Sequence, residues 1–121
     1  MSKKILIADS DPLFPESLST KLKETCDCDI ITAFDGVEAF NKARKEEVAL
    51  IIIEENTAFI DGFKFCRLLK FDKRYENLPV ILLTSHIEEA NKELAKEVKA
   101  DEYLLHSVDE NLLSKITNYV K

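Results

Sequence analysis

Five short apolar segments recur along the chain, and each is followed by a stretch in which apolar and polar residues alternate with a helical period. The central segment, residues 49–53, is aliphatic at consecutive positions, which is typical of a strand buried on both faces of a parallel sheet. The stretches between the segments place apolar residues on one side of a helix. The predicted strands are residues 4–8, 29–33, 49–53, 80–83 and 102–105.

Strands that alternate with helices through short connections predict an α/β fold with a parallel sheet. Crossovers between parallel strands are right-handed, so helices should cover both faces of the sheet in a doubly wound arrangement. The chain has 121 residues, enough for one domain with its own core, and no linker or internal repeat divides it. We therefore expect a single domain over residues 1–121.

Composition and charge make several classes of protein improbable. The net charge is −6 and the 17 basic residues are scattered, whereas direct binding of nucleic acid needs clustered Lys and Arg. No apolar run approaches the ~20 residues of a membrane span, and the first residues lack the apolar core of a signal peptide. The three cysteines have no spacing typical of zinc sites. We expect a cytoplasmic protein that contacts neither membrane nor nucleic acid.

Polar side chains follow the predicted strands at the edge where ligand sites of parallel sheets lie. Acidic and amide oxygens there would suit a hard divalent cation such as Mg²⁺. A hydroxyl with a cationic group opposite it would suit a phosphoryl oxygen. The residues concerned are Asp9, Ser10 and Asp11 after the first strand, Glu54, Glu55 and Asn56 after the third, Thr84 and Ser85 after the fourth, and His106 after the fifth.

The sequence resembles the receiver domain of two-component response regulators over its whole length. The resemblance is carried by residues 5–9 (ILIAD), 61–62 (DG), 78–84 (LPVILLT) and 100–103 (ADEY). It implies a flavodoxin-like (βα)5 fold with strand order 2-1-3-4-5. It also implies that a histidine kinase passes a phosphoryl group to the acid after the third strand while Mg²⁺ is bound beside it.

Three chemical positions depart from the family pattern. Glu54 stands at the phospho-acceptor aspartate, Ser10 at the second metal-binding acid, and His106 at the lysine that binds the phosphoryl group. Thr84 matches the switch hydroxyl and Tyr103 the switch aromatic residue. What remains for Mg²⁺ is a weak set of three residues, which are Asp9, Glu54 and Asn56.

These departures all weaken phosphoryl transfer. The extra methylene of Glu54 moves its carboxylate by ~1.5 Å, and displacements of ~1 Å can cost ~100-fold in rate where positioning is the catalysis. A histidine is largely neutral at pH 7 unless a carboxylate raises its pKa. We therefore expect a degenerate receiver that is not an enzyme. Glu54 would stand in for the phosphorylated acceptor and reach Thr84 and His106, with Glu55 as a solvated loop acid.

Other readings of the sequence stay open. The first is a receiver that still accepts a phosphoryl group, at Glu54 or a nearby acid, from a histidine kinase with Mg²⁺. The second is a haloacid-dehalogenase-type phosphatase, since Asp9 and Asp11 match its Asp-x-Asp pair, although the chain is short for that fold. A flavodoxin-type flavin carrier is disfavoured because acids after the first strand would repel phosphate.

The resemblance also implies where partners bind. The family's output surface is formed by the fourth helix, the fifth strand and the fifth helix. It corresponds here to residues 87–98, 103–105 and 108–120. We expect a protein partner or a self-dimer on this surface.

Overall fold

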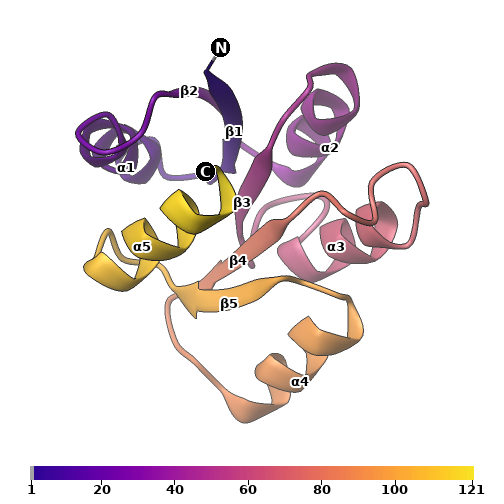
Figure 1. Ribbon diagram of the computed structural model, residues 1–121. Helices are drawn as coiled ribbons and strands as arrows, with labels where there is room; N and C mark the ends of the chain where they lie inside the picture. Colours follow the sequence, from indigo (N-terminus) through magenta and orange to yellow (C-terminus); the bar gives the residue numbers. More distant parts are fainter. Residues whose placement is uncertain (1) are drawn as a thin grey trace.

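The five strands and five helices found within residues 2–121, the part of the chain that this computed structural model describes, alternate as the sequence predicts (Figure 1). In chain order they are β1 (Lys3–Ala8), α1 (Leu13–Leu22), β2 (Cys28–Ala33), α2 (Gly36–Lys45), β3 (Leu50–Glu54), α3 (Gly62–Lys70), β4 (Val80–Thr84), α4 (Glu89–Glu97), β5 (Glu102–Leu105) and α5 (Glu110–Tyr119). All strand pairs are parallel, in the order β2-β1-β3-β4-β5. The predicted doubly wound fold and strand order are confirmed.

Alternate residues of each strand face opposite layers of helices. Figure 1 shows α1 and α5 on one face of the sheet and α2, α3 and α4 on the other. Ile5, Ile7 and Ile52 pack with the α1 and α5 side chains, whereas Leu6 and Ile53 pack with α2, α3 and α4. This two-residue period matters for the site, because it assigns each residue beyond a strand end to one of the two faces.

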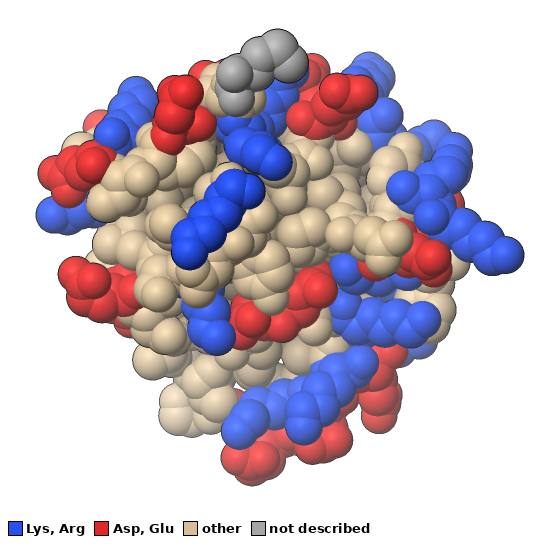
Figure 2. Space-filling model, viewed as in Figure 1, with Lys and Arg blue, Asp and Glu red and all other residues tan. Residues whose placement is uncertain are grey.

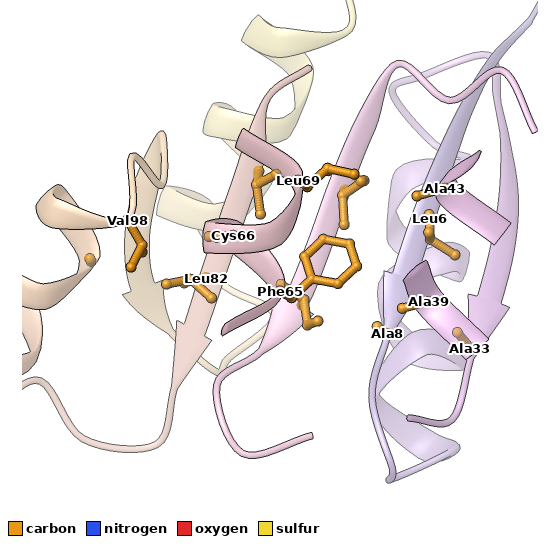
Figure 3. Close-up of a cluster of buried hydrophobic side chains, with 14 residues drawn as sticks. Leu6, Ala8, Ala33, Ala39, Ala43, Phe65, Cys66, Leu69, Leu82 and Val98 are labelled. Carbon is orange, nitrogen blue, oxygen red and sulfur yellow. The ribbon is translucent and has the colours of Figure 1, made fainter. Parts of the chain in front are cut away.

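The larger cluster lies between the sheet and α2, α3 and α4 (Figure 3). Phe65, Cys66 and Leu69 of α3 are fully buried there, so Cys66 serves as a small apolar residue. Burying a side chain of the size of Phe or Leu stabilises the fold by about 1.5–3 kcal/mol. These contacts fix α3 and, with it, the loop that joins β3 to α3.

That loop is held at both of its ends. Asp61 caps α3, because its carboxylate accepts the Lys64 N–H at 2.9 Å. A Cβ atom at Gly62 would lie 2.9 Å from the Glu55 Cα atom, and one at Gly36 would lie 1.8 Å from the Ile60 carbonyl oxygen. Both glycines therefore allow close backbone approach that no other residue permits.

Charged side chains of both signs are mixed over the face seen in Figure 2. Along α4, Lys92 pairs with Glu89 and Lys96 pairs with Glu93, three residues apart in each case. None of the helices between residues 2 and 121 combines the length and the apolar character needed to cross a membrane.

Candidate functional site

The carboxyl ends of four neighbouring strands carry the polar residues that the sequence singled out. Ala8 pairs with Ile53, Glu54 with Leu83, and Thr84 with Leu105. The segments that follow these strands therefore meet at one edge of the sheet, where ligand sites of such folds lie. The polar side chains there form two separate groups, one on each face.

The first group is the Asp9–His106 pair. Asp9 is 3% exposed, and its Oδ2 atom lies 2.5 Å from the His106 Nε2 atom. The other carboxylate oxygen of Asp9 accepts the Asp11 N–H at 2.9 Å. The His106 ring also stacks on Phe14 of α1, with 4.0 Å between ring centroids.

The pair favours the charged form of the imidazole. The hydrogen bond to Asp9 raises the pKa of His106, partial burial opposes this, and the charges of Asp9 and Glu54 raise it further. A protonated His106 facing an ionised Asp9 forms a salt bridge within the chain. The prediction that His106 pairs with Glu54 is therefore wrong, because the less exposed carboxylate of Asp9 takes the imidazole.

Glu54 lies on the side of Asp9 and His106, and its carboxylate turns back on its own loop. Its Oε2 atom accepts the Asn56 backbone N–H at 2.9 Å. Partial burial raises the pKa of Glu54, the Asn56 hydrogen bond opposes the shift, and the negative charge of Asp9 adds to it. Among the described residues, no side-chain hydrogen bond joins Glu54 to Thr84, so the expected contact between these two is also wrong.

The second group is the Glu55 cluster, formed by Glu55, Thr84 and Tyr103. The Thr84 hydroxyl donates to Glu55 Oε2 at 2.6 Å, and the Tyr103 hydroxyl donates to Glu55 Oε1 at 3.0 Å. Glu55 is 9% exposed and Thr84 is fully buried. The expectation that Glu55 is a solvated loop acid is therefore wrong.

The alternation of the strands contained the signal that sequence reasoning missed. Ile53 faces α2, α3 and α4, so Glu55, two residues on, should face the same side. Leu82 and Tyr103 belong to that face too, which places Thr84 there. Glu54 has the opposite parity and lies with Asp9 and His106.

The residues suggested for Mg²⁺ do not fit that ion here. Both carboxylate oxygens of Asp9 are engaged, by the Asp11 N–H and by His106. One oxygen of Glu54 is engaged by the Asn56 N–H, and Ser10 offers only a hydroxyl. Within residues 2–121, no three His, Cys, Asp or Glu side chains are grouped so as to hold a metal ion.

Curated relatives match the chain over most of its length. It is 37% identical to the alkaline phosphatase synthesis transcriptional regulatory protein PhoP of Bacillus subtilis over 107 residues, which are 86% of this chain and 42% of PhoP. It is 30% identical to protein PilG of Pseudomonas aeruginosa, over 97% of this chain and 87% of PilG. The chain thus spans less than half of the length of PhoP but most of that of PilG.

Solved structures share the fold. The chemotaxis protein CheY4 of Vibrio cholerae is 26% identical and superimposes with a TM-score of 0.87 over 100% of both chains. The receiver domain of the Francisella response regulator 1452 is 31% identical, with a TM-score of 0.79 over 96% of this chain and 99% of that chain. The family model for the response regulator receiver domain matches residues 5–118. On its fold, its relatives and this nearly complete match, the chain belongs to the response regulator receiver domain family.

Proposed function

We propose that this receiver domain is degenerate and signals through protein contacts without being phosphorylated. One observation carries the proposal. The two groups that would bind a phosphoryl group, the Thr84 hydroxyl and the His106 imidazole, are already bound by carboxylates of the same chain. Any phosphoryl group on Glu54 would have to displace Glu55 from Thr84 and Asp9 from His106.

Thr84 has a single hydroxyl proton to donate. A hydrogen bond to a carboxylate is about twice as strong as one between neutral groups, so the 2.6 Å contact with Glu55 takes this proton. The Thr84 oxygen also accepts the His86 N–H at 3.1 Å. The hydroxyl is thus fully used in a buried place where unpaired polar groups are costly.

The acceptor position is also unsuited to phosphoryl transfer. Transfer depends on positioning and on cations that neutralise the phosphoryl charge. The Glu54 carboxylate bonds back to Asn56 instead of projecting freely, and the donor set beside it does not fit Mg²⁺. The phosphatase reading faces the same difficulty, because its nucleophile would be Asp9, whose two oxygens are engaged.

We place the partner surface on α4, β5 and α5, which correspond to the output surface of the family. Leu105 at the end of β5 is 46% exposed and Ile87 before α4 is 36% exposed, so apolar side chains are available for contact. Helix α4, which belongs to the same surface, carries ion pairs of Lys92 with Glu89 and of Lys96 with Glu93. A protein or a second copy of the chain would bind here.

Incubation with acetyl phosphate and Mg²⁺, followed by intact mass measurement, tests the proposal. We expect the wild-type chain to gain no phosphoryl group. A positive control combines Glu54→Asp, Ser10→Asp and His106→Lys, which restores the family residue at each altered position. This variant should acquire the mass of one phosphoryl group in the presence of Mg²⁺.

Phosphorylation of the wild-type chain would contradict the proposal. A Mg²⁺-dependent adduct on the wild-type chain that disappears in Glu54→Ala would establish the alternative, a receiver phosphorylated at Glu54. A failure of the positive control to fold would be visible by circular dichroism. In that case the single variant Glu54→Asp serves as the comparison.

A further inference from the structure

Two cysteines meet at the end of the molecule that lies opposite the candidate site. Cys26 follows α1 and Cys28 begins β2, and their sulfur atoms are bonded to each other. Their Cα atoms are 5.5 Å apart, within the range typical of disulfides. The register of the sheet places Cys28 beside Lys3 at the start of β1, whereas the candidate site lies at the carboxyl ends of the strands. The pair therefore lies outside that site.

This bridge contributes little to holding the fold together. A disulfide stabilises a protein mainly by restricting the unfolded chain, and the gain grows with the length of the loop that it closes. Here the loop contains only Asp27 between the two cysteines. Both cysteines are half-buried at the border of a core cluster, so neither is enclosed. Accessible bridges are the ones that exchange with thiols, and this one is thus suited to form and break.

A hollow of about 300 Å³ opens beside Cys26. Its lining includes Lys3 at the start of β1 and Lys121 after α5, with Asp27 as the opposing charge. Ammonium groups near a cysteine favour the thiolate, which is the reactive form of the thiol. Cys28 is not among the described residues that line the hollow. A small reagent that enters the hollow therefore meets Cys26 first.

The third cysteine is kept away from such chemistry. Cys66 of α3 is fully buried in the core, and its thiol is free. Burial raises the pKa of this thiol to about 12, and a protonated thiol in apolar surroundings is inert. The chain thus combines an accessible pair with an enclosed cysteine that serves as an internal control.

We propose that Cys26 and Cys28 form a reversible redox site whose reaction partner is a disulfide of low molecular mass. The Cys26 thiolate attacks one sulfur of that disulfide, whose S–S bond breaks and releases one thiol. The Cys28 thiolate then attacks the Cys26 sulfur of the mixed disulfide and releases the second thiol. The two protons of the cysteines pass to the two released thiols, so the pair is oxidised by two electrons and the reagent is reduced by two.

A redox site here would act next to the end of α5. Val120 lines the hollow and belongs to the core cluster against which Cys26 and Cys28 pack. In reducing compartments, disulfides are transient and serve catalysis or redox sensing. The inference goes beyond the proposed function and does not depend on it, because the hollow contains none of the residues at the carboxyl ends of the strands.

Intact mass spectrometry of the whole chain in glutathione buffers tests the proposal. The reduced chain should lose the mass of two hydrogen atoms in oxidised glutathione, and excess reduced glutathione should restore them. Cys28→Ser should stop at the mixed disulfide and gain the mass of one glutathione on Cys26. Cys26→Ser should react more slowly, because its remaining thiol lies outside the hollow. Cys66→Ala is the control and should behave like the wild type.

The site of the bridge can be read from the wild-type chain alone. Cleavage after Lys and Arg gives a peptide of residues 24–42, which contains both Cys26 and Cys28 but not Cys66. The loss of two hydrogen atoms should be found in this peptide. This measurement decides the question even if circular dichroism shows that Cys66→Ala, a change in the core, does not fold.

Three results would overturn the inference. The first is independent addition of glutathione to Cys26 and Cys28 of the wild type without a bridge. The second is a bridge that persists on the folded chain in excess reduced glutathione, which would make it permanent. The third is a disulfide between two chains. None of these results bears on phosphorylation of Glu54, and a phosphoryl adduct on Glu54 would leave the redox comparison unchanged.

Discussion

The contact between Asp9 and His106 depends on pH. The Asp9 carboxylate raises the pKa of His106 above its ordinary value of 6.5. The imidazole therefore binds a proton more tightly in the folded chain than in the unfolded chain. This difference in proton affinity adds to the free energy of unfolding when His106 is protonated.

We expect this contribution to be fully present below the unfolded pKa and to disappear as the pH rises through the folded pKa of His106. The measurement is the free energy of unfolding in urea from pH ~6 to ~9. The value for the wild-type chain should exceed the value for His106→Gln by the largest amount at the acidic end. The difference between the two chains should shrink steadily towards the alkaline end.

Asp9→Asn serves as the control, because it removes the charge and keeps the shape. The NMR titration of His106 should then move to lower pH. A difference between wild type and His106→Gln that does not vary with pH would contradict this account.

At this scale the sequence predicts the identity of the site residues better than their partners. Asp9, Thr84, Tyr103 and His106 all lie at the expected edge of the sheet. Spacing alone, however, does not say which acid takes which partner. That depends on side-chain parity and burial, which place Glu55 rather than Glu54 beside Thr84.

The helices follow their sequence signals at the capped ends. Asp35 and Asp61 are typical capping residues that stand directly before α2 and α3, and their carboxylates accept the Glu38 and Lys64 N–H groups. The start of α4 is different: Glu88 is extended at φ −124° and makes no side-chain cap, so the helix begins at Glu89 rather than at Ile87. Because no capping side chain marks the first residue of α4, the apolar periodicity alone places the start of the helix two residues too early.

The end of α4 is a Schellman motif with a residue that is unusual for it. The Ala100 N–H donates to the Ala95 carbonyl and the Lys99 N–H to the Lys96 carbonyl, each at 3.0 Å. Lys99 occupies the left-handed position, with φ at 64°, where glycine is favoured. A non-glycine residue there costs about 1–2 kcal/mol, and no sequence pattern revealed it.

We predict that Lys99→Gly stabilises the fold by about 0.5–1 kcal/mol, because relief of backbone strain outweighs the cation–π contact of Lys99 with Phe71. Urea unfolding would measure the change. Lys96→Gly, within the helix, is the matched control and should destabilise by about 1 kcal/mol. Destabilisation by both substitutions would show that the motif tolerates lysine without strain.

At the scale of the whole molecule, the surface of α4, β5 and α5 is where we expect association. Leu105→Glu would place a charge among the apolar contacts there and should weaken self-association or partner binding by at least about tenfold, or ~1.4 kcal/mol. Sedimentation velocity over a range of concentrations measures the self-association.

Leu68→Glu on α3 is a control of similar exposure, at 48%, on another surface. It should leave association unchanged. A wild-type chain that stays monomeric at all concentrations would exclude a second copy as the partner and direct the search to a different protein. Equal effects of both substitutions would contradict the assignment of the surface.

The Asp9–His106 pair has a further consequence for the behaviour of the whole domain. A free ion must be drawn from solution and is lost on dilution or to a chelator, whereas an imidazole tethered to the same backbone stays at its carboxylate. The shape of this edge should therefore be the same in magnesium-starved and magnesium-replete cells. In a signalling pathway, the degenerate receiver proposed above would report on the partners it meets and not on the supply of magnesium.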